Sequence, residues 1–173
     1  MGLKKFIETY GDTFPYSVTI VNQSLPDEPL IFVNQYFLNL TGHDLAEILG
    51  TNCRFLQSGK TSLEVRAKMR DSINSRLPMC QDLLNYKKNG ELFYNRLLLI
   101  PFHEAHEKLI LGLQHVIPVG QFRPKHNVPP NDLMDRTINP LSILLGLEHM
   151  ADTRFNGEFQ KMIEKIRAYI LGL

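Results

Sequence analysis

The strongest constraint on the fold comes from three strand-like segments in the second half of the chain. Residues 79–86, 91–102 and 108–117 are rich in aliphatic and aromatic side chains, as β-strands are. Asn89-Gly90, between the first two segments, is the strongest short signal for a β-hairpin. Strands joined by short turns pair with their neighbours, so these segments predict part of an antiparallel sheet.

Two more strands are expected earlier, at residues 17–21 and 30–33, on either side of turn-forming residues 25–29. Helical signals follow them at residues 37–40, 44–50, 52–57 and 61–76, and Pro78 ends the last helix. Strands and helices do not alternate as βαβ units, and no repeat is visible. The predicted fold class is therefore α+β, a five-stranded antiparallel sheet with short helices on one face.

Residues 50–57, Gly-Thr-Asn-Cys-Arg-Phe-Leu-Gln, gather several chemically active groups within one or two turns of backbone. Asn52 and Gln57 offer paired hydrogen-bond donors and acceptors, and Arg54 offers a forked cation suited to phosphate. Cys53 offers a nucleophilic sulfur, although most such cysteines are buried structural thiols. Together these groups suit a phosphorylated heterocyclic ligand.

Side chains alternate along a strand, so residues of equal parity share one face of a sheet. One face of the three later strands then carries the amides of Asn85, Asn95 and Gln114. Any one amide alone fits a turn or a sheet edge equally well, but buried unpaired amides cost about 1–3 kcal/mol each. Jointly they indicate a polar partner, such as the polar edge of a heterocyclic ligand. The same face carries Leu83 and Gly112, together with Leu97, Leu99 and Ile110, which suit an apolar end of the same ligand.

Residues 52–57, Asn-Cys-Arg-Phe-Leu-Gln, resemble the signature of LOV domains, the flavin-binding blue-light branch of the PAS superfamily. The resemblance extends over roughly residues 14–118 and implies the PAS/LOV fold. It also implies FMN as the cofactor. Family members that use FAD carry an insertion after the signature helix, and the direct run from Gln57 to Arg70 leaves no space for one.

The resemblance implies a role for each candidate residue. Cys53 forms the light-driven bond to the flavin, and Gln114 resembles the family's switching glutamine beside flavin nitrogen 5. Arg54 and Arg70 resemble the pair that holds the terminal phosphate, with Arg66 as the alternative. The other implied contacts are Asn52 and Gln57 on the ribityl and ring side, Asn85 and Asn95 on the pyrimidine edge, and Leu56, Leu97, Leu99 and Ile110 around the ring.

The function implied is that of a blue-light photoreceptor and not of an enzyme. Light makes nitrogen 5 of the flavin basic and carbon 4a electrophilic, and the sulfur of Cys53 adds to form a reversible cysteinyl-flavin adduct. Because light creates the reactivity, Cys53 needs no lowered thiol pKa in darkness. Two alternatives stay open: a flavin-based redox sensor in which Cys53 is incidental, and a PAS dimerisation module with no essential ligand.

Charge and composition argue against several other classes of protein. Lys and Arg number 19 against 18 Asp and Glu, a net charge of +1, so direct nucleic-acid binding is not expected. No secretory signal and no membrane-spanning apolar run are visible, so we expect no membrane association. Two cysteines without an export signal indicate a reducing, cytoplasmic setting. No metal site is predicted, since His103 and His106 form only an isolated pair.

The sequence divides into four parts. Residues 1–13 form an N-terminal cap segment, and residues 14–118 form the predicted LOV domain. Residues 119–132 are proline-rich and predict a linker. Residues 133–173 carry two apolar helical segments, which predict a C-terminal helical extension that forms a light-sensitive homodimer. The alternative is that both helices fold back on their own sheet. A downstream protein partner is expected, but no sequence feature identifies it.

Overall fold

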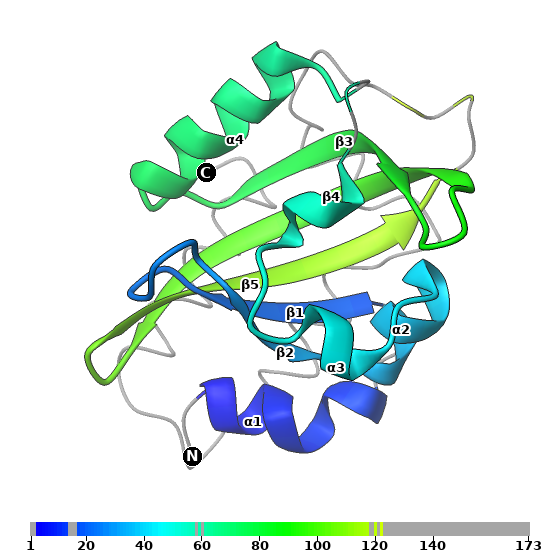
Figure 1. The fold of residues 1–173 in the computed structure, drawn as a ribbon. Coiled ribbons are helices and arrows are strands. Elements are labelled where there is room, and N and C mark those ends of the chain that lie inside the picture. The colour runs from blue at the N-terminus through cyan, green and yellow to red at the C-terminus, as the bar shows by residue number, and fades with distance from the viewer. Residues whose placement is uncertain are drawn as a thin grey trace.

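The computed structural model describes residues 3–13, 17–57, 59, 61–117, 120 and 122, and its centre is a five-stranded antiparallel sheet (Figure 1). The strands are β1 Ser17–Asn22, β2 Leu30–Val33, β3 Met79–Tyr86, β4 Leu92–Glu104 and β5 Glu107–Val116. Their order across the sheet is β2-β1-β5-β4-β3, so the N-terminal hairpin pairs with the last strand. The predicted α+β fold with an antiparallel sheet is confirmed.

Two hairpins hold the three long strands in one register. β3 and β4 pair along the whole length of β3, around a turn in which Gly90 has a φ angle of 83°. Glycine adopts this left-handed conformation without a steric penalty, which explains why Asn89-Gly90 marks the turn. β4 ends at Glu104, two residues later than predicted, because Glu104 still pairs with Glu107 across the second hairpin.

Four short helical elements connect β2 to β3. They are α2 Gln35–Thr41, α3 Leu45–Ile48, the 3-10 turn η2 Cys53–Leu56 and α4 Leu63–Asn74. The side chains of Asn34, Asn52 and Ser62 cap α2, η2 and α4 by accepting hydrogen bonds from backbone N–H groups, and Asp44 begins α3 with a capping box. The predicted helical signals are confirmed, with the Cys53 segment forming a 3-10 turn.

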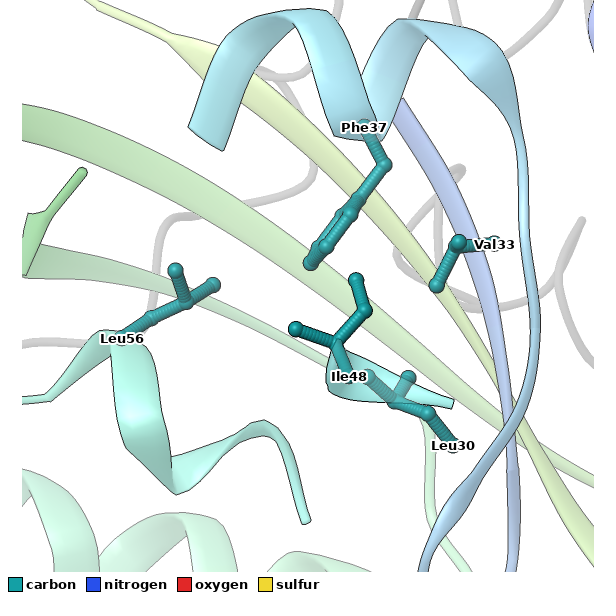
Figure 2. Close-up of a cluster of buried hydrophobic side chains, with 5 residues drawn as sticks. All are labelled: Leu30, Val33, Phe37, Ile48 and Leu56. Atoms are coloured by element: carbon teal, nitrogen blue, oxygen red, sulfur yellow. The ribbon is translucent and has the colours of Figure 1, made fainter. Parts of the chain in front are cut away.

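A buried apolar cluster fixes the position of η2 over the sheet (Figure 2). It consists of Leu30 and Val33 from β2, Phe37 from α2, Ile48 from α3 and Leu56 from η2. Cys53 and Phe55 pack against this cluster from η2. Truncating a buried phenylalanine such as Phe37 to alanine costs about 3–5 kcal/mol, so the cluster anchors the turn that carries Cys53 firmly.

The N-terminal segment lies against the opposite face of the sheet. It forms α1 Leu3–Tyr10 and the 3-10 turn η1 Gly11–Thr13. Gly11 lies so close to Phe32 that an added Cβ would stand 2.7 Å from the phenylalanine ring. Side chains alternate along β2, so Phe32 lies on the face opposite to Val33 and its cluster. The cap segment is therefore a helix on the far side, which the expectation of helices on one face does not include.

Several predictions lie outside the described residues. The linker at residues 119–132 is described only at Gly120 and Phe122, and the helices at residues 133–173 are not described. The ring of Phe122 packs edge-on against Tyr94 of β4, with centroids 4.7 Å apart. Within the described ranges, no helix is long and apolar enough to cross a membrane.

Candidate functional site

A cavity of about 290 Å³ lies between the sheet and the helical elements η2 and α4. The structure brings all twelve predicted cofactor-site residues to its wall. They are Asn52, Cys53, Arg54, Leu56, Gln57, Arg70, Asn85, Asn95, Leu97, Leu99, Ile110 and Gln114. The alternative arginine, Arg66, lines the cavity as well. The residues identified by strand parity and those of the signature stretch therefore line the same cavity.

Three buried amides form a hydrogen-bonded row across β3, β4 and β5. Asn95 Nδ2 donates to Asn85 Oδ1 at 2.8 Å and to Gln114 Oε1 at 3.5 Å. Asn85 Nδ2 donates to the backbone carbonyl of Leu56 at 3.1 Å, which ties the row to η2. Asn95 is 1% exposed, and its Oδ1 accepts no hydrogen bond from any described residue. Such a buried acceptor costs about 1–3 kcal/mol, so it is suited to a ligand N–H.

Most of the remaining sheet face inside the cavity is apolar, and Thr19 is the polar exception. Leu99 and Ile110 line it and form a buried cluster with Met79, against which Val21, Leu97 and the α4 residues Met69 and Ile73 pack. Gly112 lies on the same face of β5, where an added Cβ would stand 2.5 Å from Thr19 Oγ1. The absence of a side chain at Gly112 lets a ligand approach the strand backbone closely. A flat ring fits such a surface.

Cys53 is the first residue of η2. Asn52 Oδ1 accepts a hydrogen bond from the backbone N–H of Arg54 at 3.0 Å, so the turn begins at Cys53. Cys53 is half-buried and packs against the apolar cluster of Figure 2. Burial raises the pKa of its thiol to about 12, so the sulfur keeps its proton at neutral pH. At neutral pH, Cys53 therefore presents a protonated thiol to the cavity and not a thiolate.

Charged side chains gather where the turn between β1 and β2 meets η2 and α4. Arg54 pairs with Asp27 at 2.5 Å, and its side chain is 57% exposed. Arg66 has a buried Nε with no hydrogen-bond partner in the part of the chain that the structure describes. Arg70 and Glu28 complete this part of the cavity wall. Three cations against two carboxylates leave a formal excess of one positive charge, which suits an anionic group.

Eight other residues line the cavity without being part of the predicted set of site residues. They are Thr19, Val21, Glu28, Met69, Ile73, Asn74, Leu83 and Gly112. Parity along β1 could identify Thr19 and Val21, and the helical spacing of Met69 and Ile73 already indicates an inward stripe on α4. Glu28 carries no such signal, because a turn residue has neither strand nor helix periodicity.

The cavity thus combines a polar edge, an apolar centre and a cationic end. This set fits the pyrimidine edge, the ring and the phosphate of FMN, the cofactor that the resemblance to LOV domains implies. Among the described residues, no group of three or more His, Cys, Asp or Glu side chains could hold a metal ion. The amides, the aliphatic side chains and the arginines of the wall suit an organic ligand.

Comparison with known proteins points to one family. A PAS domain model matches residues 15–116. The LOV domain of the Erythrobacter litoralis EL346 blue-light activated histidine kinase is 35% identical with a TM-score of 0.57, over 60% of this chain and 97% of that domain. The Rhodobacter sphaeroides LOV protein is 27% identical with a TM-score of 0.68, over 98% of this chain and 94% of that protein. The second similarity extends beyond the PAS region.

Curated relatives match slightly more than half of this chain. A blue-light-activated histidine kinase of Brucella canis is 46% identical over 91 residues, which are 52% of this chain and 18% of the kinase. One of Rhizobium johnstonii is 41% identical over 98 residues, which are 57% of this chain and 28% of the kinase. The match spans less than a third of these relatives' length, so the kinase activity in their names is stated of those proteins alone.

Proposed function

The chain belongs to the LOV branch of the PAS domain family, and from this premise we propose that it is a blue-light photoreceptor that binds FMN. Activation by blue light is common to the Brucella canis, Rhizobium johnstonii and Erythrobacter litoralis relatives. In this proposal, light drives a reversible bond between Cys53 and the flavin. The outcome is a signal and not the turnover of a substrate.

The observation that carries the proposal is the unpartnered Oδ1 of Asn95 within the row of amides. Asn85, Asn95 and Gln114 are each no more than 4% exposed. Burying three amides in a core costs free energy unless each finds a partner. The pyrimidine edge of a flavin offers an N–H beside carbonyl oxygens in one plane, which matches the acceptor and donors of this row.

Cys53 supplies the reactive group on the protein side. When bound, the flavin supplies a ring nitrogen that becomes basic and a ring carbon that becomes electrophilic on absorbing blue light. Cys53 would supply both the proton and the sulfur that this chemistry takes from the protein, and both would return to the thiol in darkness. The raised thiol pKa supports this role, because the sulfur keeps its proton until light creates the base.

The arginines support FMN over a flavin without phosphate. Arg66 and Arg70 are four residues apart on α4 and so lie on the same side of the helix. Arg54 comes from η2 and lines the same cavity. Guanidinium groups bind phosphate through paired N–H donors, so these three residues would hold the terminal phosphate of FMN.

Absorption spectroscopy of the purified, flavin-loaded chain tests this function. The proposal expects a structured absorption band in the blue that bleaches under blue light and recovers in darkness. A band that bleaches only on addition of a reductant would support the redox sensor instead. A chain that takes up no flavin would support the dimerisation module.

We also propose that residues 133–173 form a homodimer whose stability depends on light and which acts on a downstream protein. Gln114 lies in β5 two residues before Val116, where the strand ends, so a change at its amide can reach the residues that follow. The similarity to the Rhodobacter sphaeroides LOV protein over 98% of this chain includes those residues. A coupling of about 1–3 kcal/mol would change the dimer constant about 5- to 150-fold.

Size-exclusion chromatography in darkness and under blue light tests the dimer. The full chain, a truncation after Val119 and Gln114→Leu should be compared over a wide range of concentrations. A full chain that elutes identically in both states, or a truncation that stays equally dimeric, would contradict the proposed output.

A further inference from the structure

The turn between β1 and β2 borders the cavity in a strained conformation. Asp27 and Glu28 have φ angles of 63° and 49°, in the left-handed region that side chains other than glycine rarely adopt. Two such residues in succession persist only where surrounding contacts hold them. The contacts of this turn therefore bear on any ligand that enters beside it.

Two residues of the LOV signature hold the turn from one side. Asn52 Nδ2 donates to the backbone carbonyls of Asp27 at 2.6 Å and of Glu28 at 3.2 Å. Arg54 Nη1 donates to the carboxylate of Asp27 at 2.5 Å. The guanidinium of Arg54 thus binds Asp27 in the structure, whereas the proposed function requires it to bind the phosphate.

A second set of contacts holds the turn independently of Arg54. Gln23 Nε2 donates to Glu28 Oε1 at 3.3 Å, and Gln23 Oε1 accepts a hydrogen bond from Arg76 Nη1. Arg76 is itself anchored on β4, because its Nη2 donates to the backbone carbonyl of Phe102 at 2.5 Å. The turn can therefore keep its place when Arg54 changes partner.

We propose that Asp27 is a specificity-determining residue that competes with the phosphate of the ligand for Arg54. The inference rests on the proposed function, since it concerns the FMN site. The side chains of Arg54 and Asp27 are 57% and 66% exposed, so their ion pair is weak and exchangeable. A phosphate monoester carries more charge and more acceptor oxygens than a carboxylate, so it takes the guanidinium from Asp27.

The competition predicts that Asp27 reduces the preference for FMN over riboflavin, which has the same ring and ribityl chain without the phosphate. Asp27→Asn removes the charge, keeps the size and tolerates the left-handed backbone. It should strengthen FMN binding about 2- to 5-fold, the range of an exposed ion pair, and leave riboflavin binding unchanged. Fluorescence titration of each flavin with the full chain in darkness measures both dissociation constants.

Glu91→Gln is the matched control. Glu91 is 57% exposed, pairs with Lys87 at 2.7 Å and does not line the cavity, so its loss should change neither constant. Adding Arg54→Ala to Asp27→Asn identifies the partner, because the gain from Asp27→Asn should vanish without Arg54. A preference for FMN that Asp27→Asn leaves unchanged or lowers would overturn the proposal. An equal gain with and without Arg54 would overturn it too.

Thermal melting of the flavin-free chain separates competition from a structural role. Losing an exposed ion pair should change the Tm of Asp27→Asn by less than about 4 °C, and a larger loss would mark Asp27 as structural and overturn the proposal. The proposed function fails in a different way. If the chain binds neither flavin, the photoreceptor proposal is contradicted. If the chain bleaches reversibly but Asp27→Asn has the same FMN preference as the parent, only the competition proposal is contradicted.

Discussion

The two ends of the cavity differ in how deeply their side chains are buried and in the type of interaction they make. At the amide end, Asn85, Asn95 and Gln114 are no more than 4% exposed and lie in three paired strands, so the register of the sheet sets their spacing. At the arginine end, Arg54 is 57% exposed and pairs with Asp27 of a surface turn. Hydrogen bonds in a buried row are costly to leave unmade, whereas exposed ion pairs are weak. Changes at the amide end should decide whether a flavin binds, and changes at the arginine end which flavin is preferred.

The largest effect is expected at Gly112, beside the amide end. Gly112→Ala would place a Cβ 2.5 Å from Thr19 Oγ1 and fill the space against β5. Overpacking of this kind lowers the free energy of unfolding by about 1–3 kcal/mol, and we expect flavin content after purification to fall sharply. Gly120→Ala is the control, because nothing lies within 4 Å of a Cβ there. Adding Thr19→Ala should restore part of the loss, and full flavin content in Gly112→Ala alone would contradict the close approach.

A smaller but clear effect is expected at Asn95. Asn95→Leu keeps the volume, removes the unpartnered acceptor and leaves Asn85 Oδ1 without its donor. Losing about 1–3 kcal/mol of hydrogen bonding should weaken the binding of FMN and of riboflavin alike, by about 5- to 150-fold. Flavin titration measures this, with the exposed Asn39→Leu of α2 as control. If Asn95→Leu weakened the binding of FMN but not of riboflavin, the amide end and not the arginine end would bind the phosphate.

Substitution of the arginines should change the preference for FMN over riboflavin more than it changes the affinity for the flavin ring. Arg54→Ala together with Arg70→Ala should weaken FMN by up to about 5-fold per exposed contact and leave riboflavin unchanged. Arg66→Ala should cost more, because the Nε of Arg66 is buried. The ratio of the two dissociation constants measures each effect. If both variants keep the FMN preference of the parent chain, the phosphate is bound elsewhere.

The smallest effect concerns pH. Because burial raises the pKa of the Cys53 thiol to about 12, the extent of light-induced bleaching should stay constant between about pH 6 and 9. Above the ordinary thiol pKa of 9.0, the unfolded chain loses this proton before the folded chain does. The free energy of unfolding should then fall as pH rises, and less steeply in Cys53→Ser. Bleaching that titrates near neutral pH would show that Cys53 reacts as a dark thiolate.

The same contrast explains what could be predicted from the sequence. Strand periodicity and Asn89-Gly90 locate the long strands within two residues, and parity collects Asn85, Asn95 and Gln114 on one face, because regular structure repeats in the sequence. The pairing of Arg54 with Asp27 has no such periodicity, since an acidic residue in a turn is usually solvated. The side of the sheet that α1 covers also escapes prediction, because an amphipathic helix does not specify which face it meets.

Light-minus-dark absorption of the flavin-loaded chain and of Cys53→Ser tests the central claim most directly. Serine is nearly isosteric with cysteine, and the amides and arginines are unchanged, so Cys53→Ser should retain FMN. The account predicts that the blue absorption band of the parent chain bleaches and recovers in darkness, while the band of Cys53→Ser persists under the same light and its flavin fluorescence rises. Reversible bleaching of Cys53→Ser with the parent's difference spectrum would contradict the account, because the bond would then form without the Cys53 sulfur.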